Sequence, residues 1–227
     1  MSNARSVLRE IIDMSAELGR PERDLVILGE GNTSALCDDA SFWVKASGTQ
    51  LRAPSEETFV RLWCEPVCAL ADKASMSDDA FKAALDQAKV DPNVAKRSST
   101  ETVLHGLALT EGGASFVGHT HPVAVNAIMC SVAAEEVVSG RIFPDEIVVC
   151  GPAPAYVPYA DPGLALARAV RQVMHRYMDT WHIPPKVMVL QNHGLIAMGS
   201  SPTEVGSITS MFVKTCRVLA GTMAFGG

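Results

Sequence analysis

The 227-residue sequence has no long apolar run, no excess of basic residues and no close cluster of cysteines. No window approaches the roughly 18 consecutive apolar residues that predict a membrane-spanning helix. The formal net charge is −6 and the lysines and arginines are scattered, so neither a nucleic-acid surface nor a membrane partner is expected. Repeats, low-complexity segments and linker-like runs are also lacking, and we therefore expect residues 1–227 to form one domain.

The six cysteines are spread along the chain and stand mostly among apolar neighbours. Cys64 and Cys68 are spaced to share one face of a helix, but no further ligands stand near them to complete a metal site. Buried free thiols are the favoured interpretation, and they are typical of a reducing compartment. The N-terminal residues show no apolar run behind a basic patch, so we expect no secretory signal and a cytoplasmic protein.

Apolar residues at helical spacing predict several amphipathic helices. We expect helices over residues 6–18, 55–62, 98–109, 122–131, 163–178 and 201–220, and a partly polar one within 72–89. The run Ser201-Pro202-Thr203-Glu204 has the capping-box pattern with proline at the first helical position, which is typical of a helix start.

Short apolar runs bounded by turn residues predict strands. We expect strands over residues 25–28, 35–37, 42–46, 114–119, 147–150 and 187–190, the last continued by 195–198. Residues 29–34 and 151–162 are rich in glycine or proline and are expected to be a turn and a loop. Short strands with interleaved helices predict a mixed sheet covered by helices.

Two histidines separated by one residue, His119 and His121, end one of the predicted strands. Side chains alternate along a strand, so both imidazoles point to the same face. A third histidine, His193, follows another buried strand and precedes a glycine. Three neutral imidazoles commonly hold a zinc ion with one coordination position open. Either strand histidine alone would suit an ordinary hydrogen-bonded residue, but the combination favours a metal site.

Glu101 stands near the start of the predicted helix over residues 98–109. One interpretation is a capping box, with Ser98 as the N-cap and Glu101 as its partner. In the other, the carboxylate lies beside a metal-bound carbonyl group of a substrate and moves a proton. The remaining histidines lack such a context and are predicted not to be ligands: His105, His175 and His182.

Three separate turns are rich in hydroxyl and N–H groups: Gly31-Asn32-Thr33-Ser34, Ser47-Gly48-Thr49 and Ser99-Thr100. Backbone amides in turns and at helix N-termini bind anions without needing lysine. Any one of these runs alone indicates only a turn. Three of them in a chain with a histidine triad favour a phosphate or similar anion as a ligand.

Taken in order, these motifs resemble those of the class II aldolase and adducin family, which includes fuculose-phosphate aldolase, rhamnulose-phosphate aldolase and ribulose-phosphate 4-epimerase. The resemblance covers nearly the whole chain. It implies an α/β fold with three α/β/α layers around a central mixed, mostly antiparallel sheet. It also implies a homotetramer with the active site at a subunit interface.

The resemblance also implies roles for single residues. It implies that zinc, or else manganese or another divalent cation, is bound by His119, His121 and His193. Glu101 would be the catalytic acid–base residue. The substrate phosphate would be held by Asn32, Ser47, Gly48, Ser99 and Thr100.

The activity implied by the resemblance is that of a metal-dependent aldolase, an aldehyde-lyase, acting on a small sugar phosphate through a metal-stabilised enediolate. Epimerisation, dehydration of a ketose phosphate and decarboxylation of a phosphorylated 3-oxo acid need the same site, so the motifs do not separate these reactions. A non-catalytic adducin-like scaffold is a further alternative, but it has no need of an intact triad and Glu101.

The sequence departs from the family pattern in two places. The family's aldolases and epimerases use a tyrosine of the C-terminal tail as a proton donor, and the tail of this sequence, residues 222–227, has none. The hydroxyl pair before Glu101 is Ser99-Thr100 where the family has two serines. The added methyl group is expected to narrow the pocket.

Overall fold

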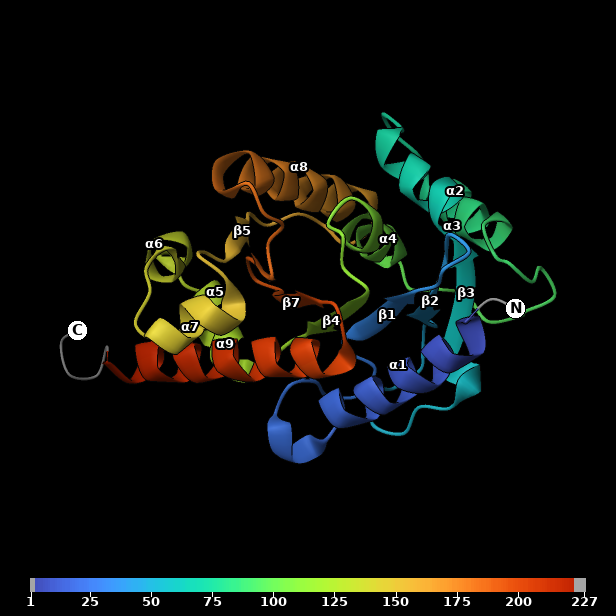
Figure 1. Ribbon diagram of the computed structural model, residues 1–227. Helices are drawn as coiled ribbons and strands as arrows, with labels where there is room; N and C mark the ends of the chain where they lie inside the picture. The colour runs from blue at the N-terminus through green and yellow to red at the C-terminus, as the bar shows by residue number, and fades with distance from the viewer. Residues whose placement is uncertain (1–2, 223–227) are drawn as a thin grey trace.

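Seven strands form one mixed sheet, and helices cover both of its faces (Figure 1). The computed structural model describes residues 3–222. The strand order is β3-β2-β1-β4-β7-β6-β5; β5 and β6 run parallel, and the other neighbouring strands run antiparallel. The expected three-layer α/β/α fold with a mostly antiparallel sheet is confirmed. That residues 1–227 form a single domain stays a prediction.

The strands are β1 (Asn32–Leu36), β2 (Ser41–Lys45), β3 (Phe59–Trp63), β4 (Phe116–Thr120), β5 (Ala155–Val157), β6 (Val187–Leu190) and β7 (Gly194–Gly199). The helices are α1 (Ala4–Leu18), α2 (Cys64–Cys68), α3 (Asp78–Gln87), α4 (Thr102–Thr110), α5 (Val123–Met129), α6 (Ala134–Ser139), α7 (Pro144–Cys150), α8 (Leu164–Trp181) and α9 (Pro202–Thr222). Three 3₁₀ helices are η1 (Pro21–Arg23), η2 (Glu56–Thr58) and η3 (Ala69–Asp72).

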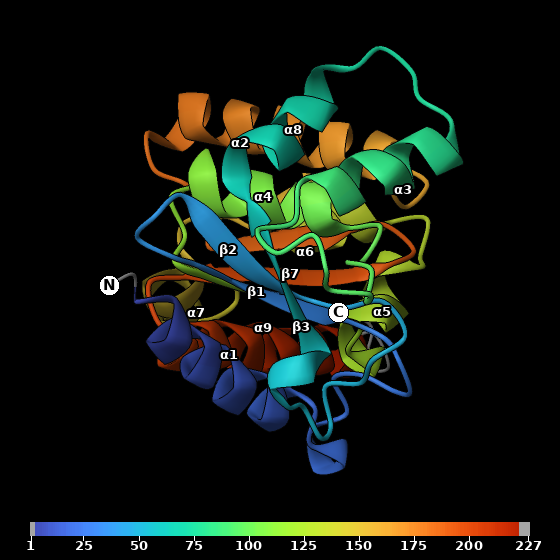
Figure 2. The ribbon, with the colours of Figure 1, turned by 90° about the vertical axis from the view of Figure 1, so that its right-hand side faces the viewer.

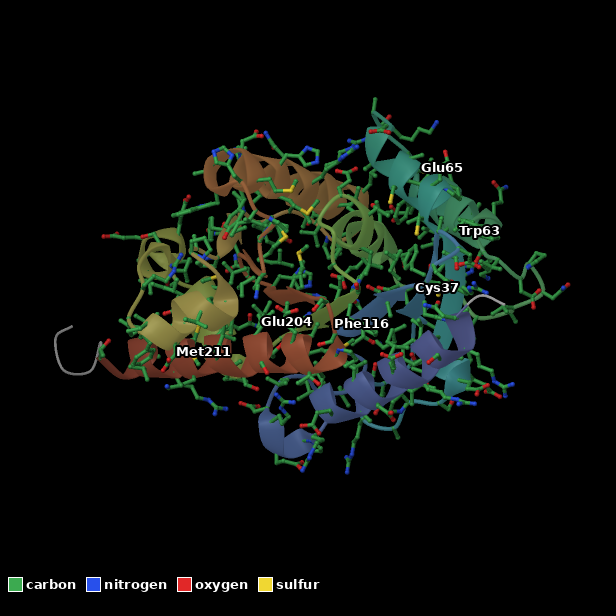
Figure 3. The ribbon with its side chains drawn as sticks, in the orientation of Figure 1. Cys37, Trp63, Glu65, Phe116, Glu204 and Met211 are labelled. Atoms are coloured by element: carbon green, nitrogen blue, oxygen red, sulfur yellow. The ribbon has the colours of Figure 1, made fainter. Side chains whose placement is uncertain are left out.

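Each face of the sheet has its own apolar core. Helices α2, α4 and α8 lie over one face, and α1 and α9 lie over the other (Figure 2). Alternation along β4 divides its side chains between the two cores, because Phe116 packs with α1 and α9 (Figure 3) and Val117 packs with α4 and α8. His119 comes two residues after Val117 and therefore points to the face that α4 covers.

Three predictions in the N-terminal half are wrong. Residues 25–28 form no strand: the backbone of Leu28 has a positive φ of 50° and its side chain is 78% exposed. Strand β1 begins instead at Asn32, inside the run expected to be a turn. The helix expected over 55–62 is one 3₁₀ turn followed by β3, because alternating burial from Val60 onward suits a strand that pairs with β2.

Three predictions in the C-terminal half are also wrong. Residues 147–150 are the end of helix α7, where Pro144 and two acidic residues in the first turn favour a helix start over the β-branched run. The expected loop 151–162 contains β5, which pairs with β6. Residues 195–198 do not continue β6 but lie in β7, which folds back antiparallel to it.

All six cysteines are free thiols. Burial raises the pKa of three of them to about 12: Cys64, Cys150 and Cys216. Cys130 is exposed and departs from the expected burial. In residues 3–222, helices that combine the length and apolar character of a membrane span are absent.

The capping box predicted at the start of α9 is present in one half only, because Ser201 caps the helix but Glu204 bonds to the N–H of Ser200 and not to that of Ser201. The Ser201 hydroxyl accepts from the Glu204 N–H (3.2 Å), and Glu204 accepts from the Ser200 N–H (2.8 Å) and from Lys186 Nζ (2.8 Å). Figure 3 shows Glu204 on α9 beside the sheet. The Lys186 ammonium, together with the Ser200 hydrogen bonds, lowers the pKa of Glu204 from 4.5 to about 2.

We expect Glu204→Gln to lower the free energy of unfolding by about 1–2 kcal/mol at pH 7, measured by urea denaturation. Because the folded-state pKa is depressed, the stabilisation is complete above pH 4.5 and is lost as the pH falls toward 2. The difference between the two proteins should therefore shrink over that range. Glu10→Gln, on the exposed face of α1, is the control. A difference that stays constant down to pH 2 would contradict this account.

Candidate active site

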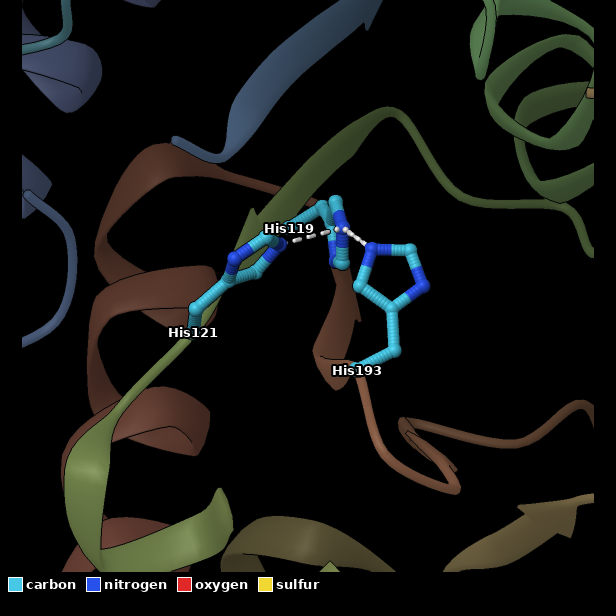
Figure 4. Close-up of side chains that lie close together, drawn as sticks. All are labelled: His119, His121 and His193. Carbon is cyan, nitrogen blue, oxygen red and sulfur yellow. Dashed lines mark hydrogen bonds between the residues drawn. The ribbon is translucent and has the colours of Figure 1, made fainter. Parts of the chain in front are cut away.

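Three imidazoles from segments far apart in the sequence converge beside the middle of the sheet (Figure 4). His119 lies near the end of β4, His121 directly follows β4, and His193 lies in the turn between β6 and β7. Nε2 of His119 is 3.1 Å from Nε2 of His121 and 3.3 Å from Nε2 of His193. The structure thus brings together the three histidines that the sequence singled out.

The arrangement of these nitrogens fits a divalent cation. Zinc–nitrogen bonds of about 2.0 Å place two tetrahedral ligands about 3.3 Å apart, close to the two distances from His119. All three ligand atoms lie within 4.8 Å of one another. Nδ1 of His119 is 3.0 Å from the Leu195 carbonyl oxygen and donates to it, which leaves the Nε2 lone pair pointing at the other two rings. Lone pairs that face one another at this distance repel unless a proton or a cation lies between them.

Two glycines allow the strands to come this close. A Cβ atom at Gly194 would lie 2.5 Å from the Thr120 carbonyl oxygen and 2.8 Å from the His121 ring. At Gly31, which has a φ of +66°, a Cβ atom would lie 2.6 Å from the His119 carbonyl oxygen. These contacts explain the glycines at the start of β7 and just before β1.

Burial and nearby charges shift the pKa values of His121 and His119 in opposite directions. Burial, with smaller contributions from His119 and His193, lowers the pKa of His121 to about 3, so its imidazole is neutral, as a metal ligand must be. Burial also lowers the pKa of His119, but the Glu101 carboxylate outweighs burial and raises it. A cation that binds at His119 therefore competes with a proton, and its affinity should fall as the pH falls.

The Glu101 side chain points at the triad. Its Oε1 is 3.0 Å from Nε2 of His193 and its Oε2 is 3.5 Å from Nε2 of His119. Burial alone raises the pKa of Glu101, but the two imidazoles outweigh it and hold the pKa far below its ordinary value. Glu101 occupies the N-cap position of α4 and makes no side-chain cap bond, so the capping-box interpretation is wrong.

Asn32 lies against Glu101. Its Nδ2 donates to Glu101 Oε2 (2.6 Å) and lies 3.4 Å from the Ser99 hydroxyl, and its Oδ1 contacts the His105 ring. Register explains the placement: Asn32 pairs with His119 across β1 and β4, so both side chains point to the face covered by α4. The amide of Asn32 is 4% exposed and is occupied by protein partners.

The other predicted phosphate-binding residues lie near one another. Ser47 and Thr100 line a cavity of about 150 Å³ together with Arg97, and the Ser47 N–H donates to the Arg97 carbonyl (2.8 Å). Gly48, with a φ of +76°, forms the exposed turn beside Ser47. The Ser99 hydroxyl accepts from the Glu101 N–H (3.2 Å).

Three buried or charged residues here were not expected from the sequence. His105 is fully buried beside Asn32, and its position four residues after Glu101 could have revealed it, because that spacing puts both on one helix face. Lys45 is 3% exposed, and its ammonium donates to the carbonyls of Gly29 (3.1 Å) and Thr49 (2.7 Å). Neither Lys45 nor Arg97 has a sequence signal beyond its charge.

A cavity of about 320 Å³ adjoins the triad, and its walls include His121, Glu30 and Val123. A larger one of about 780 Å³ lies between α1 and α9, away from the converging imidazoles. Tyr177 is buried and donates to the Ala153 carbonyl, so it is not free for proton transfer. Of the tail without a tyrosine, residues 222–227, only Thr222 is among the described residues.

Comparisons with known proteins identify the family of the chain and its fold. The family profile described as "Class II Aldolase and Adducin N-terminal domain" matches residues 9–220. The N-terminal class II aldolase domain of a conserved protein from Thermoplasma acidophilum is similar in structure, with a TM-score of 0.73 and 24% identity over 94% of this chain and 93% of that chain.

Two further solved structures share the fold. The sugar-phosphate aldolase from Thermotoga maritima gives a TM-score of 0.73 at 14% identity, covering 98% of this chain and 97% of that chain. The l-fuculose-1-phosphate aldolase from Thermus thermophilus gives 0.67 at 13% identity, with the same coverage of 98% and 97%. No curated protein matches the chain. At these identities the similarities establish the fold.

Proposed function

Since the chain belongs to the class II aldolase and adducin family, we propose that it is a divalent-metal-dependent aldolase that cleaves or forms a carbon–carbon bond in a small sugar phosphate. One observation carries the proposal: an ionised Glu101 lies within 3.0–3.5 Å of two imidazoles of a converging histidine triad. A carboxylate beside a cation-binding site is the arrangement that proton transfer next to a carbonyl group requires.

His119, His121 and His193 would hold the cation, and zinc suits three imidazole ligands best. When bound, it would supply the Lewis acid that stabilises negative charge on the substrate's carbonyl oxygen. Glu101 removes or returns the proton at the carbon next to that carbonyl group, since its low pKa makes it a carboxylate at neutral pH. Asn32 orients Oε2 of Glu101 during the transfer.

The phosphate group of the substrate would bind at Asn32, Ser47, Gly48, Ser99 and Thr100. Arg97, on the same cavity as Ser47 and Thr100, and the buried Lys45 ammonium behind the turn at Thr49 provide positive charge for an anion. Holding the phosphate away from the reacting carbons orients the substrate. We also propose that the protein is a cytoplasmic homotetramer, which size-exclusion chromatography with light scattering would test.

A screen of phosphorylated ketoses and phosphorylated 3-oxo acids, run with added zinc and with added manganese, tests the proposed function. We expect a ketose phosphate to yield dihydroxyacetone phosphate or glycolaldehyde phosphate together with an aldehyde. Release of carbon dioxide from an oxo acid would assign decarboxylation in place of aldol cleavage. Turnover of no substrate by metal-loaded protein would favour a scaffold.

A further inference from the structure

The ring of His121 has a carboxylate beside the nitrogen that does not face the other imidazoles. Its Nε2 lies 3.1 Å from Nε2 of His119, so Nδ1 is the atom left for a partner outside the triad. Oε1 of Glu30 lies 3.8 Å from this Nδ1, and both residues line the cavity of about 320 Å³. At His119 the equivalent nitrogen donates to the Leu195 carbonyl oxygen. Glu30 therefore stands at His121 where that carbonyl stands at His119.

The segment before β1 holds the Glu30 carboxylate in this place. Oε2 of Glu30 accepts from the Ile27 N–H (3.1 Å), and the Glu30 N–H donates to the Ile27 carbonyl (2.9 Å). The His121 N–H donates to the Leu25 carbonyl (2.8 Å), so the same segment is docked on the residue whose ring Glu30 faces. One carboxylate oxygen is thus fixed by the turn, and the other is directed at Nδ1.

The turn that carries Glu30 is unfavourable by local criteria. Leu28, inside the turn, has a positive φ of 50°, a backbone conformation that is costly for a residue with a Cβ atom. Its apolar side chain is 78% exposed, so burial does not offset this cost. Strained backbone of this kind is concentrated at functional sites, where the surrounding structure maintains it. A role for Glu30 at His121 accounts for a turn that neither propensity nor packing favours.

A cation on the triad makes the Nδ1 atom of His121 a hydrogen-bond donor. A neutral imidazole carries one proton, and a cation on Nε2 leaves that proton on Nδ1. Histidine ligands usually donate this N–H group to a carboxylate or carbonyl oxygen, which fixes the orientation of the ring. The separation of 3.8 Å is longer than a hydrogen bond, but the Glu30 side chain is 38% exposed and has room to close it.

We propose that Glu30 is a positioning residue for His121: its carboxylate accepts from the Nδ1–H group and holds the ring with Nε2 turned to the cation. The proposal rests on the metal site of the proposed function and adds to it a residue that the motifs do not single out. Glu30 acts through His121 and raises the affinity for the cation without binding the cation or the substrate.

Zinc affinity, measured on the full chain by competition with a chelator and without substrate, tests this role. Glu30→Gln keeps the size of the side chain but has one acceptor oxygen, which the Ile27 N–H and the His121 Nδ1–H must share. We expect the Kd for zinc to rise about tenfold. Asp24→Asn removes a charge from the wall of the same cavity and should change the Kd less than about twofold. An unchanged Kd in Glu30→Gln, or equal losses in the two variants, overturns the proposal.

Asn126 offers an uncharged acceptor on the same cavity and is the competing candidate. Its Oδ1 is buried and has no hydrogen-bond partner among residues 3–222. If Glu30 is the partner of His121, Asn126→Ala should keep the Kd for zinc within about threefold of the wild-type value. A tenfold loss of affinity in Asn126→Ala, with wild-type affinity in Glu30→Gln, would transfer the role to Asn126 and overturn the proposal.

The Nδ1–H group of His121 reports the contact directly. In ¹⁵N-histidine-labelled, zinc-loaded wild type at pH 7, its proton should exchange with solvent at least about tenfold more slowly than in Glu30→Gln. Equal exchange in the two proteins, or a His121 proton on Nε2, overturns the proposal. If the wild type binds zinc but turns over no ketose phosphate, the proposed aldolase fails, and these measurements still decide the role of Glu30. If the wild type binds no zinc, both proposals fail.

Discussion

Replacement of His119 by alanine is expected to remove the metal from the protein and to lower aldolase turnover by at least about 10³-fold. His119 is the central member of the triad, because its Nε2 lies 3.1 Å and 3.3 Å from the other two ligand atoms. Its ring is 0% exposed and anchored on the Leu195 carbonyl, so water cannot take its place without rebuilding the site. Metal analysis after dialysis, together with kcat/KM on the ketose phosphate found by the screen, measures both effects.

Loss of the ligand has to be separated from loss of the fold. Zinc that binds only the folded protein at 100 times its Kd raises the free energy of unfolding by about 2.7 kcal/mol. The wild type should therefore melt at a higher temperature with zinc than with chelator, whereas His119→Ala should melt at the same temperature in both. Far-UV circular dichroism of the two proteins in chelator should coincide. One tightly bound zinc per chain in His119→Ala, with normal turnover, would show that the triad is not the metal site.

The sequence predicted which three histidines come together, because the position of each one follows from local strand and turn geometry. His119 and His121 share a strand face by period-two alternation, and His193 stands in the turn after a buried strand. The distance between the two strands was not predictable from spacing alone. It depends on β7 pairing back against both β6 and β4, in a hairpin whose apolar strands lie on either side of the short polar turn at Asn192.

Local patterns failed where long-range pairing or a single helix start decided the structure. Residues 25–28 are as apolar as a buried strand, yet they pair with no strand, and the side chain of Leu28 is exposed to solvent. Residues 147–150 are β-branched, but Pro144 begins a helix before them. The hydrogen bonds behind Glu101 needed both β1 and α4 in place, so a buried His105 looked like an ordinary helix residue.

Replacement of Glu101 by glutamine is expected to lower turnover by about 10²–10⁴-fold while leaving zinc bound. The substitution keeps the size of the side chain but removes the charge that makes it a base, and an amide cannot take up a proton at neutral pH. Solvent exchange measures the proton-transfer step directly. Wild-type protein in D₂O should exchange the proton next to the carbonyl group of dihydroxyacetone phosphate, as followed by NMR, and Glu101→Gln should not.

The matched control is Glu111→Gln, at the opposite end of α4, where the carboxylate pairs with Arg171 and His175 and cannot reach the triad. It should retain normal turnover and normal exchange. Zinc content distinguishes a lost base from a damaged metal site, because Glu101 lies near two of the ligands without being one of the three converging imidazoles. Full turnover by Glu101→Gln would show that Glu101 is not the base and serves only as a hydrogen-bond partner of Asn32. The proton would then have to move through another group beside the 320 Å³ cavity, where Oε1 of Glu30 lies 3.8 Å from Nδ1 of His121.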